Sequence, residues 1–250
     1  MRIIFSPTKK MVHDEYASYQ HLPVFLDETS KILAYLQSLS FEELKKLWKC
    51  NDKLAKENYE RIQDMDLRGH LTPALFAYTG LAFSHLAPNI LSEEAYQYLE
   101  EHLRILSGFY GVLKPFDGVT PYRLEMQSKT KIEGYKDLYM FWDYKLYEEV
   151  IDESHLIINL ASKEYAKCIE NFLSDEDLMV TIVFGEYKDG KVISKGTKAK
   201  MARGEIVRYL AMNRIEDLEG IKGFDAMNYQ YDKTLSDERT YYFIENDVEE

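Results

Sequence analysis

Cysteine, proline and glycine are scarce in this 250-residue sequence, which has 2, 6 and 12 of them. Cys50 and Cys168 lie far apart and form no CxxC pair, so we expect no disulfide framework and a reduced, cytoplasmic setting. So few prolines and glycines argue against a collagen-like or linker-dominated chain. Apolar runs are much shorter than the ~18 residues of a membrane span. The start, with only Ile3–Phe5 as an apolar run, is not typical of a signal peptide, and no membrane partner is expected.

Common catalytic and nucleotide-binding motifs are also missing. The sequence contains no Walker A, GxGxxG or GxSxG motif. Its six histidines show no HExxH and no paired His/Cys spacing. The sequence therefore predicts neither a metal site nor a cofactor. Cys168, in the middle of an expected helix, is more typical of a packed thiol than of a nucleophile.

Acidic residues outnumber basic ones by 43 to 31, a formal charge of -12. This total argues against a protein coated in basic residues, yet it allows a local basic cleft. Residues 190–214 carry seven basic side chains against Glu205 alone, a net +6. Lys198, Lys200 and Arg203 crowd the start of an expected helix, where positive charge opposes the helix dipole. That arrangement predicts an anionic partner.

Periodicity predicts a mixed α/β fold in which helices dominate the first half, whereas strands and helices alternate in the second. A strand is expected at Arg2–Phe5, and Ser40 with Glu43 forms a capping box at the start of a helix. Further helices are expected over residues 51–64, 73–83, 92–102 and 198–213. Further strands are expected over 155–160, 178–187, 191–195 and 241–245, with a hairpin at Asp189–Gly190. We expect one compact α+β domain over residues 1–250, with a central mixed sheet and flanking helices.

The segment 103–117 is the most unusual in the chain. A helix is expected to end near Ser107, and Gly108 and Gly111 then bracket two aromatic residues. A glycine hairpin between helices presents backbone N–H groups to a phosphate, and Lys114 would add charge. The alternative, which spacing alone favours, is a glycine turn that packs its aromatic side chains inward.

Two later segments also carry candidate binding residues. On a strand over residues 121–126, Arg123 and Glu125 would share one face, either as a solvated edge or as an ion pair in a pocket. Ser162 follows a buried strand at the start of a helix, where α/β proteins place ligands. It is either an anion seat or an ordinary N-cap.

These segments resemble the YaaA family of bacterial peroxide-stress proteins. The resemblance rests on residues 6–9, 52–55, 103–117, 121–126, 137–142, 159–165 and 199–204. It implies a cytosolic protein that limits iron-dependent oxidative DNA damage under hydrogen peroxide. It also implies a helix-hairpin-helix element and a basic cleft that binds duplex DNA non-specifically. Departures from the family pattern are Thr8 and the run Ala74–Tyr78, which lacks an expected base and acid.

By position, the resemblance places the hairpin on residues 107–112 and the cations in the cleft. The DNA-binding residues it implies are Lys9, Ser107, Gly108, Tyr110, Gly111, Lys114, Arg123, Ser162, Lys200 and Arg203. Because the chain is acidic overall, binding is expected to be weak and sensitive to salt.

An enzyme acting on a small anionic ligand in the same cleft is the alternative. Glu125, Glu164 and Tyr165 are its candidate catalytic residues, because acids and a tyrosine beside basic groups suit general acid–base chemistry. The two carboxylates are also poorly suited to contact a phosphate backbone. Direct iron storage is not indicated, since no Glu-x-x-His spacing occurs.

Overall fold

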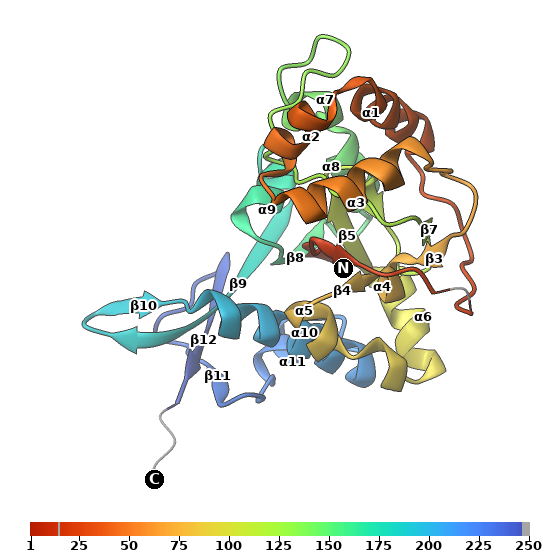
Figure 1. Ribbon diagram of the computed structural model, residues 1–250. Coiled ribbons are helices and arrows are strands. Elements are labelled where there is room, and N and C mark those ends of the chain that lie inside the picture. Colours follow the sequence, from red (N-terminus) through yellow and green to blue (C-terminus); the bar gives the residue numbers. More distant parts are fainter. Residues whose placement is uncertain (15, 247–250) are drawn as a thin grey trace.

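A mixed eight-stranded sheet forms the centre of the protein in the computed structural model, which describes residues 1–14 and 16–246 (Figure 1). The strand order is β11-β12-β9-β8-β1-β5-β6, with β10 paired to β9. The strands of this sheet are β1 Arg2–Phe5, β5 Leu103–Ser107, β6 Gly111–Leu113, β8 Leu156–Leu160, β9 Leu178–Lys188, β10 Lys191–Ile193, β11 Tyr229–Tyr231 and β12 Thr240–Glu245. Two short ladders pair β2 Lys10–Met11 with β4 Tyr78–Thr79 and β3 Thr72–Pro73 with β7 Gly118–Val119.

The middle of the sheet is parallel and fully covered. β12, β9, β8, β1 and β5 run parallel, and Ile3 of β1 lies between Ile158 of β8 and Leu103 of β5. Ile3 and Ile4, on opposite faces of the same strand, are both completely buried. A continuous apolar run of this kind is what a strand needs when helices cover both faces of its sheet.

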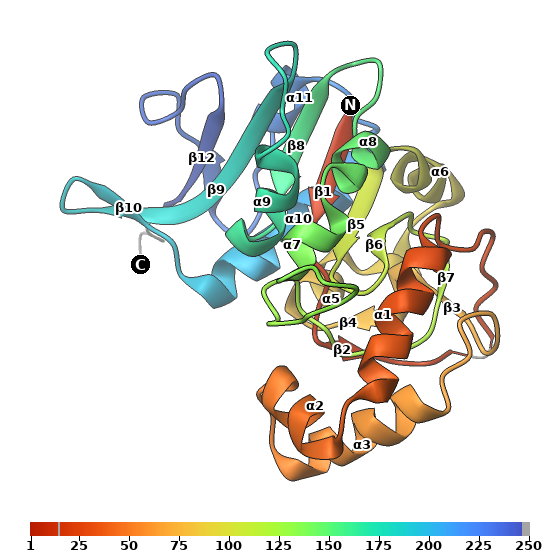
Figure 2. The ribbon, with the colours of Figure 1, turned by 90° about the horizontal axis from the view of Figure 1, so that it is seen from above.

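Helices lie on both sides of the sheet (Figures 1 and 2). Their bounds are α1 Leu26–Ser38, α2 Phe41–Trp48, α3 Asp52–Gln63, α4 Ala74–Ala77, α5 Leu81–Leu86, α6 Glu93–His102, α7 Leu138–Trp142, α8 Lys145–Val150, α9 Lys163–Glu170, α10 Gly196–Asn213 and α11 Leu218–Lys222, with a 3-10 turn at Pro88–Ile90. The predicted mixed α/β class with a central mixed sheet is therefore confirmed. Among the described residues, no helix is both long and apolar enough to cross a membrane.

Local sequence signals placed several elements correctly. β1 has the predicted bounds. The capping box is present: the Glu43 N–H donates to Ser40 Oγ at 3.4 Å, and the Ser40 N–H donates to the Glu43 carboxylate at 2.9 Å. Asp189 and Gly190 both have left-handed φ angles, 52° and 77°. This is the conformation of a two-residue hairpin that matches the twist of its strands.

The predicted helix-hairpin-helix at residues 107–112 is wrong. The helix before it ends at His102, and Leu103–Ser107 is the strand β5, which pairs in parallel with β1 and antiparallel with β6. All five residues of β5 are buried, Arg104 among them. Because Gly108–Tyr110 connects two strands, the segment is a β-hairpin inside the sheet and not a turn between helices.

Two other elements also differ from the prediction. Residues 73–83 form two helices, α4 and α5, separated by the short strand β4. Residues 121–126 form no strand, although the predicted alternation holds: Tyr122 and Leu124 are buried, whereas Arg123 and Glu125 are partly exposed. The two charged side chains therefore still point to one side.

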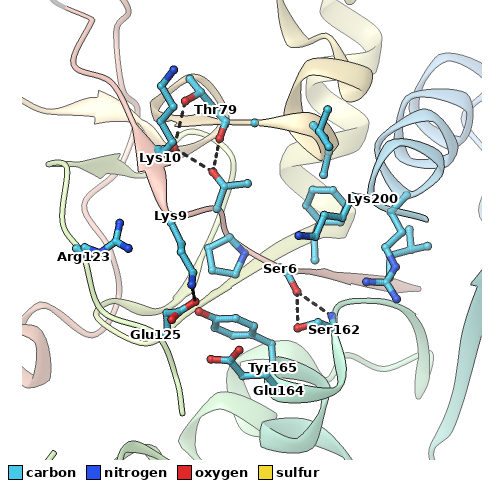
Figure 3. A pocket seen from close by; sticks show the side chains of 18 of the residues that line it. Ser6, Lys9, Lys10, Thr79, Arg123, Glu125, Ser162, Glu164, Tyr165 and Lys200 are labelled. Carbon is cyan, nitrogen blue, oxygen red and sulfur yellow. Dashed lines mark hydrogen bonds and ion pairs between the residues drawn. The ribbon is translucent and has the colours of Figure 1, made fainter. Parts of the chain in front are cut away.

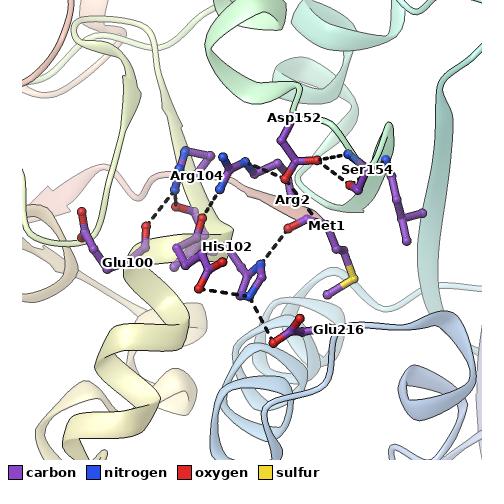
Figure 4. Close-up of polar contacts among 11 residues, drawn as sticks. Met1, Arg2, Glu100, His102, Arg104, Asp152, Ser154 and Glu216 are labelled. Carbon is purple, nitrogen blue, oxygen red and sulfur yellow. Dashed lines mark hydrogen bonds and ion pairs between the residues drawn. The ribbon is translucent and has the colours of Figure 1, made fainter.

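Polar contacts hold β1 at its start (Figure 4). Arg2 Nε lies 3.1 Å from the Asp152 carboxylate, and the Met1 amine lies 3.4 Å from it. On the other side, His102 Nδ1 hydrogen-bonds the Met1 carbonyl at 2.8 Å. These contacts fix the central strand, and with it the residues that follow its carboxyl end.

Candidate functional site

A cavity of about 600 Å³ lies at the carboxyl ends of β1 and β8 (Figure 3). Phe5 and Leu160, the last residues of those two strands, line it. β1 lies between β8 and β5 in the sheet. The chain passes from β1 to β5 on one side and only later forms β8 on the other side, so the strand order reverses at β1. Open α/β sheets bind ligands at such a point, where the strand order reverses.

One wall of the cavity is the loop that follows β1. The Thr8 hydroxyl donates to the Thr79 carbonyl at 2.6 Å, and Lys10 pairs with Thr79 in the β2–β4 ladder. These bonds bring residues 79–82 beside residues 6–10 and so close that side of the cavity. Thr8, a departure from the family pattern, therefore has a structural role here.

The opposite wall is α10, which supplies Lys200 and Arg203. These residues are three positions apart and so share a helix face. α10 packs very closely on α5 at Gly204. A Cβ added at Gly204 would lie only 1.9 Å from the Ala82 carbonyl oxygen. Among the described residues neither cation pairs with a carboxylate, and Arg203 Nε is buried without a hydrogen-bond partner. Burial lowers the pKa of Arg203.

Acidic side chains line the floor of the cavity. Lys9 Nζ lies 2.8 Å from Glu125, and Glu164 accepts a hydrogen bond from the Gln127 N–H at 3.1 Å. Burial, together with the neighbouring Glu125, raises the pKa of Glu164. Burial raises the pKa of Tyr165 well above its usual value. The site thus combines unpaired cations with partly desolvated acids.

Two serines lie where β1 and β8 end. The Ser162 N–H donates to Ser6 Oγ at 2.8 Å, and the Ser6 hydroxyl lies 3.3 Å from Ser162 Oγ. Ser162 occupies the N-cap position of α9, but its side chain makes no capping bond. Ser6 therefore already uses the Ser162 amide that an anion would bind. The position of Ser6 directly after the buried strand β1 is the signal that could have identified Ser6 as a residue of the site.

The glycine hairpin lies beneath the cavity and does not line it. Ser107 Oγ accepts hydrogen bonds from the N–H groups of Phe109 and Tyr110 at 3.1 and 2.8 Å, and all three residues are completely buried. Ser107 also hydrogen-bonds Tyr122, which lines the cavity. The N–H groups predicted to bind a phosphate therefore already donate to Ser107 within the hairpin. The segment is the inward-packed glycine turn that was the alternative prediction.

Gly108 has a packing role. A Cβ at this position would lie 3.0 Å from the Leu124 carbonyl oxygen, so only glycine lets residues 124–126 approach without adjustment. Lys114 lies elsewhere, in a separate cavity beside Arg104. The hairpin therefore supports the floor of the site and contributes no side chain to it.

The structure brings most of the predicted site residues together. Those that line the cavity are Lys9, Arg123, Glu125, Ser162, Glu164, Tyr165, Lys200 and Arg203, whereas Ser107, Gly108, Tyr110, Gly111 and Lys114 do not. Sequence reasoning missed Lys10, Thr79 and Leu81, which also line it. Within the described ranges, no group of three or more His, Cys, Asp or Glu side chains is arranged to hold a metal ion.

Much of the positive charge in residues 190–214 is neutralised by neighbours. Lys195 pairs with Glu186, Lys198 pairs with Glu245, and Arg208 pairs with Glu205. The unpaired charge that reaches the cavity comes from Lys200 and Arg203, which Lys10 and Arg123 join from other segments.

Comparison with known proteins gives a consistent result. The family described as peroxide stress protein YaaA matches residues 1–235. A UPF0246 protein from Agathobacter rectalis is 52% identical over 244 residues, covering 97% of this chain and 98% of the relative. A UPF0246 protein from Lachnoclostridium phytofermentans is 50% identical, and the alignment covers 99% of this chain and 97% of the relative. A UPF0246 protein from Pediococcus pentosaceus is 48% identical, and the alignment covers 99% of both chains.

Proposed function

The chain belongs to the family of peroxide stress protein YaaA, and on that premise we propose that it binds duplex DNA at the mouth of the cavity. Binding there would limit iron-dependent oxidative damage to the DNA. The observation that carries the proposal is the gathering of Lys10, Arg123, Lys200 and Arg203 at one cavity in a chain of charge -12.

Electrostatics favour a polyanion at this place. The four cations come from three separate segments, with Lys200 and Arg203 both on α10. Among the described residues, none of the four forms an ion pair. Surface cations are usually solvated or paired, and clustering four without a carboxylate partner costs free energy through mutual repulsion. A phosphate backbone relieves that repulsion and releases its own counterions.

The turn between α2 and α3 is a second contact surface in this proposal. Lys49 has a left-handed conformation that ends α2, and Asn51 caps α3 by accepting from the Leu54 N–H at 3.0 Å. Two consecutive helices joined by so short a turn have the general form of a helix-hairpin-helix. Lys46, Lys49 and Lys53 around this turn are all exposed. We assign to it the phosphate contact that the buried hairpin at residues 107–112 does not offer.

Substitution of the α10 cations tests the proposal. Lys200→Ala with Arg203→Ala should weaken binding to a random-sequence duplex by about 10- to 100-fold, because two charge-assisted phosphate contacts are lost. Lys233→Ala, which removes an exposed lysine outside the cavity, is the matched control and should bind as the wild type does. Equal affinities for the double variant and the control would refute the proposal.

A second candidate function, an enzyme acting on a small anionic substrate, is favoured by one observation. Glu164 has a raised pKa, and Glu125 and Tyr165 line the same cavity. A carboxyl group whose pKa is shifted toward neutrality suits proton transfer. Survival of hydrogen peroxide should then be lost in cells carrying Glu164→Gln as completely as in cells carrying Lys200→Ala. Full survival with Glu164→Gln would exclude catalysis by this acid.

A further inference from the structure

Binding of a phosphate backbone uses the cationic rim of the cavity and leaves its interior unexplained. The recess of about 600 Å³ falls within the range of pockets that hold small organic ligands, roughly 300–1,000 Å³. Pro7, Leu81 and Ala82, which all keep some exposed surface, give it apolar walls. A small, strongly hydrated phosphate group gains nothing from apolar walls, whereas a planar nucleobase does.

The acids inside the recess point to the same kind of group. Glu125 and Glu164 are both partly buried and line the cavity together. A carboxylate repels phosphate, but it accepts hydrogen bonds from the amino and imino N–H groups of a base. Each carboxylate has about four lone-pair sites, so the existing contacts with Lys9 and Gln127 leave acceptor capacity in both.

Arg203 suits the phosphate that would accompany such a base. It is more buried than Lys200, and its Nε has no partner among the described residues. A guanidinium without a carboxylate partner at the edge of a cavity is suited to bind a phosphate through more than one N–H group. Lys200, one helical turn earlier and exposed, reaches the same region (Figure 3).

Resting on the proposed DNA binding, we propose that the cavity receives a single nucleotide extruded from the duplex. The base enters between the apolar walls, and Glu125 and Glu164 accept its N–H groups. The phosphate stays at Lys200 and Arg203. Enzymes and sensors that examine a base take it out of the stack in this way, and a mismatched base costs least to extrude. In this arrangement the cations bind the phosphate and the acids bind the base, so both kinds of side chain contribute to binding the same nucleotide.

The test compares duplexes that differ in one base pair. The full chain should bind a duplex with a central mismatch at least about tenfold more tightly than the fully matched duplex, since less unpairing free energy is spent. Leu81→Trp fills the recess from a wall position that is 42% exposed and adds no charge. In this variant the ratio of the two affinities should fall to about one.

Met212→Trp is the matched control, because Met212 lies on α10, is 61% exposed and does not line the cavity. It should retain the wild-type ratio. Thermal melting of both variants confirms that each is folded. A third titration uses free thymidine 5′-monophosphate and deoxyadenosine 5′-monophosphate, so that an extruded nucleotide is distinguished from a free one.

The outcomes separate this inference from the proposed function. A mismatch preference that Leu81→Trp removes and Met212→Trp keeps supports extrusion. Equal affinity of the wild type for both duplexes overturns extrusion while leaving DNA binding intact. Binding of the free nucleotides without binding of either duplex overturns both, and makes the cavity a site for a small nucleotide.

Discussion

At the scale of single residues, the buried carboxylate of Asp177 is the clearest case of environment setting chemistry. Burial alone would raise the pKa of Asp177, but hydrogen bonds from His155, the Ser174 N–H and the Tyr147 hydroxyl outweigh burial and lower that pKa to about 2. The Asp177 side chain has no exposed surface. Its ionised form is therefore stabilised only in the folded state.

This shift predicts how stability depends on pH. The pKa of Asp177 lies below its unfolded value, so it contributes about 2 kcal/mol that is complete above about pH 4 and is lost as the pH falls toward 2. The hydrogen bond to Asp177 raises the pKa of His155. The His155 contribution is therefore complete below about pH 6.5 and is lost as the pH rises through its folded pKa.

Urea unfolding of the wild type and Asp177→Asn over a pH series measures both effects. The difference in unfolding free energy should be largest between about pH 4 and 6.5 and should shrink on either side. A difference that stays constant from pH 2 to pH 9 would contradict the assignment of charge to this pair.

At the scale of elements, the contact between α5 and α10 determines where the cavity cations lie. Gly204 lets the two helices approach so closely that an added Cβ would overlap the Ala82 carbonyl. Gly204→Ala should therefore cost about 1–3 kcal/mol by overpacking. It should lower the melting temperature by about 2–4 °C for each kcal/mol and weaken DNA binding, because α10 carries Lys200 and Arg203.

Gly196→Ala is the control within the same helix. A Cβ at Gly196, the first residue of α10, meets nothing within 4 Å. Since alanine favours the helix over glycine by about 0.5–1 kcal/mol, this variant should melt at or above the wild-type temperature. Equal melting temperatures for Gly204→Ala and Gly196→Ala would show that the helix contact is not tight.

Elements whose signals lie within a few residues could be predicted from the sequence. Elements whose secondary structure depends on a partner strand far away in the sequence could not. The capping box at Ser40 and the hairpin at Asp189–Gly190 depend on neighbours within three residues, and both are present. Residues 103–107 are a short, mainly apolar segment that periodicity cannot assign to helix or strand. Pairing with β1, a hundred residues earlier, makes them a strand.

The same distinction applies to the site. Lys200 and Arg203 could be identified because a basic cluster at a helix start is visible in the sequence. Lys10 and Thr79 were missed because only the β2–β4 ladder brings their two segments together. For the glycines at 108 and 111, spacing alone favoured the inward-packed turn that the structure shows, whereas the resemblance implied a phosphate-binding hairpin. The sequence does not show that β5 and β6 bury the turn between them.

At the scale of the whole molecule, charge is unevenly distributed. The chain carries -12 in total, whereas the cavity collects four cations without ion-pair partners among the described residues. The acidic remainder repels a polyanion, so we expect weak binding in one orientation. The exposed lysines around the α2–α3 turn are the second contact surface that we propose, and their loss should weaken binding equally for all duplex sequences.

The dependence of DNA affinity on salt is the sharpest test of binding at the cavity. If the four cavity cations contact phosphates, the logarithm of the association constant should fall with the logarithm of salt concentration with a slope of about -3.6 or steeper, or 0.9 for each cation. Lys200→Ala with Arg203→Ala should reduce that slope by about 1.8. A flat salt dependence, or one that the double variant leaves unchanged, would contradict DNA binding at the cavity.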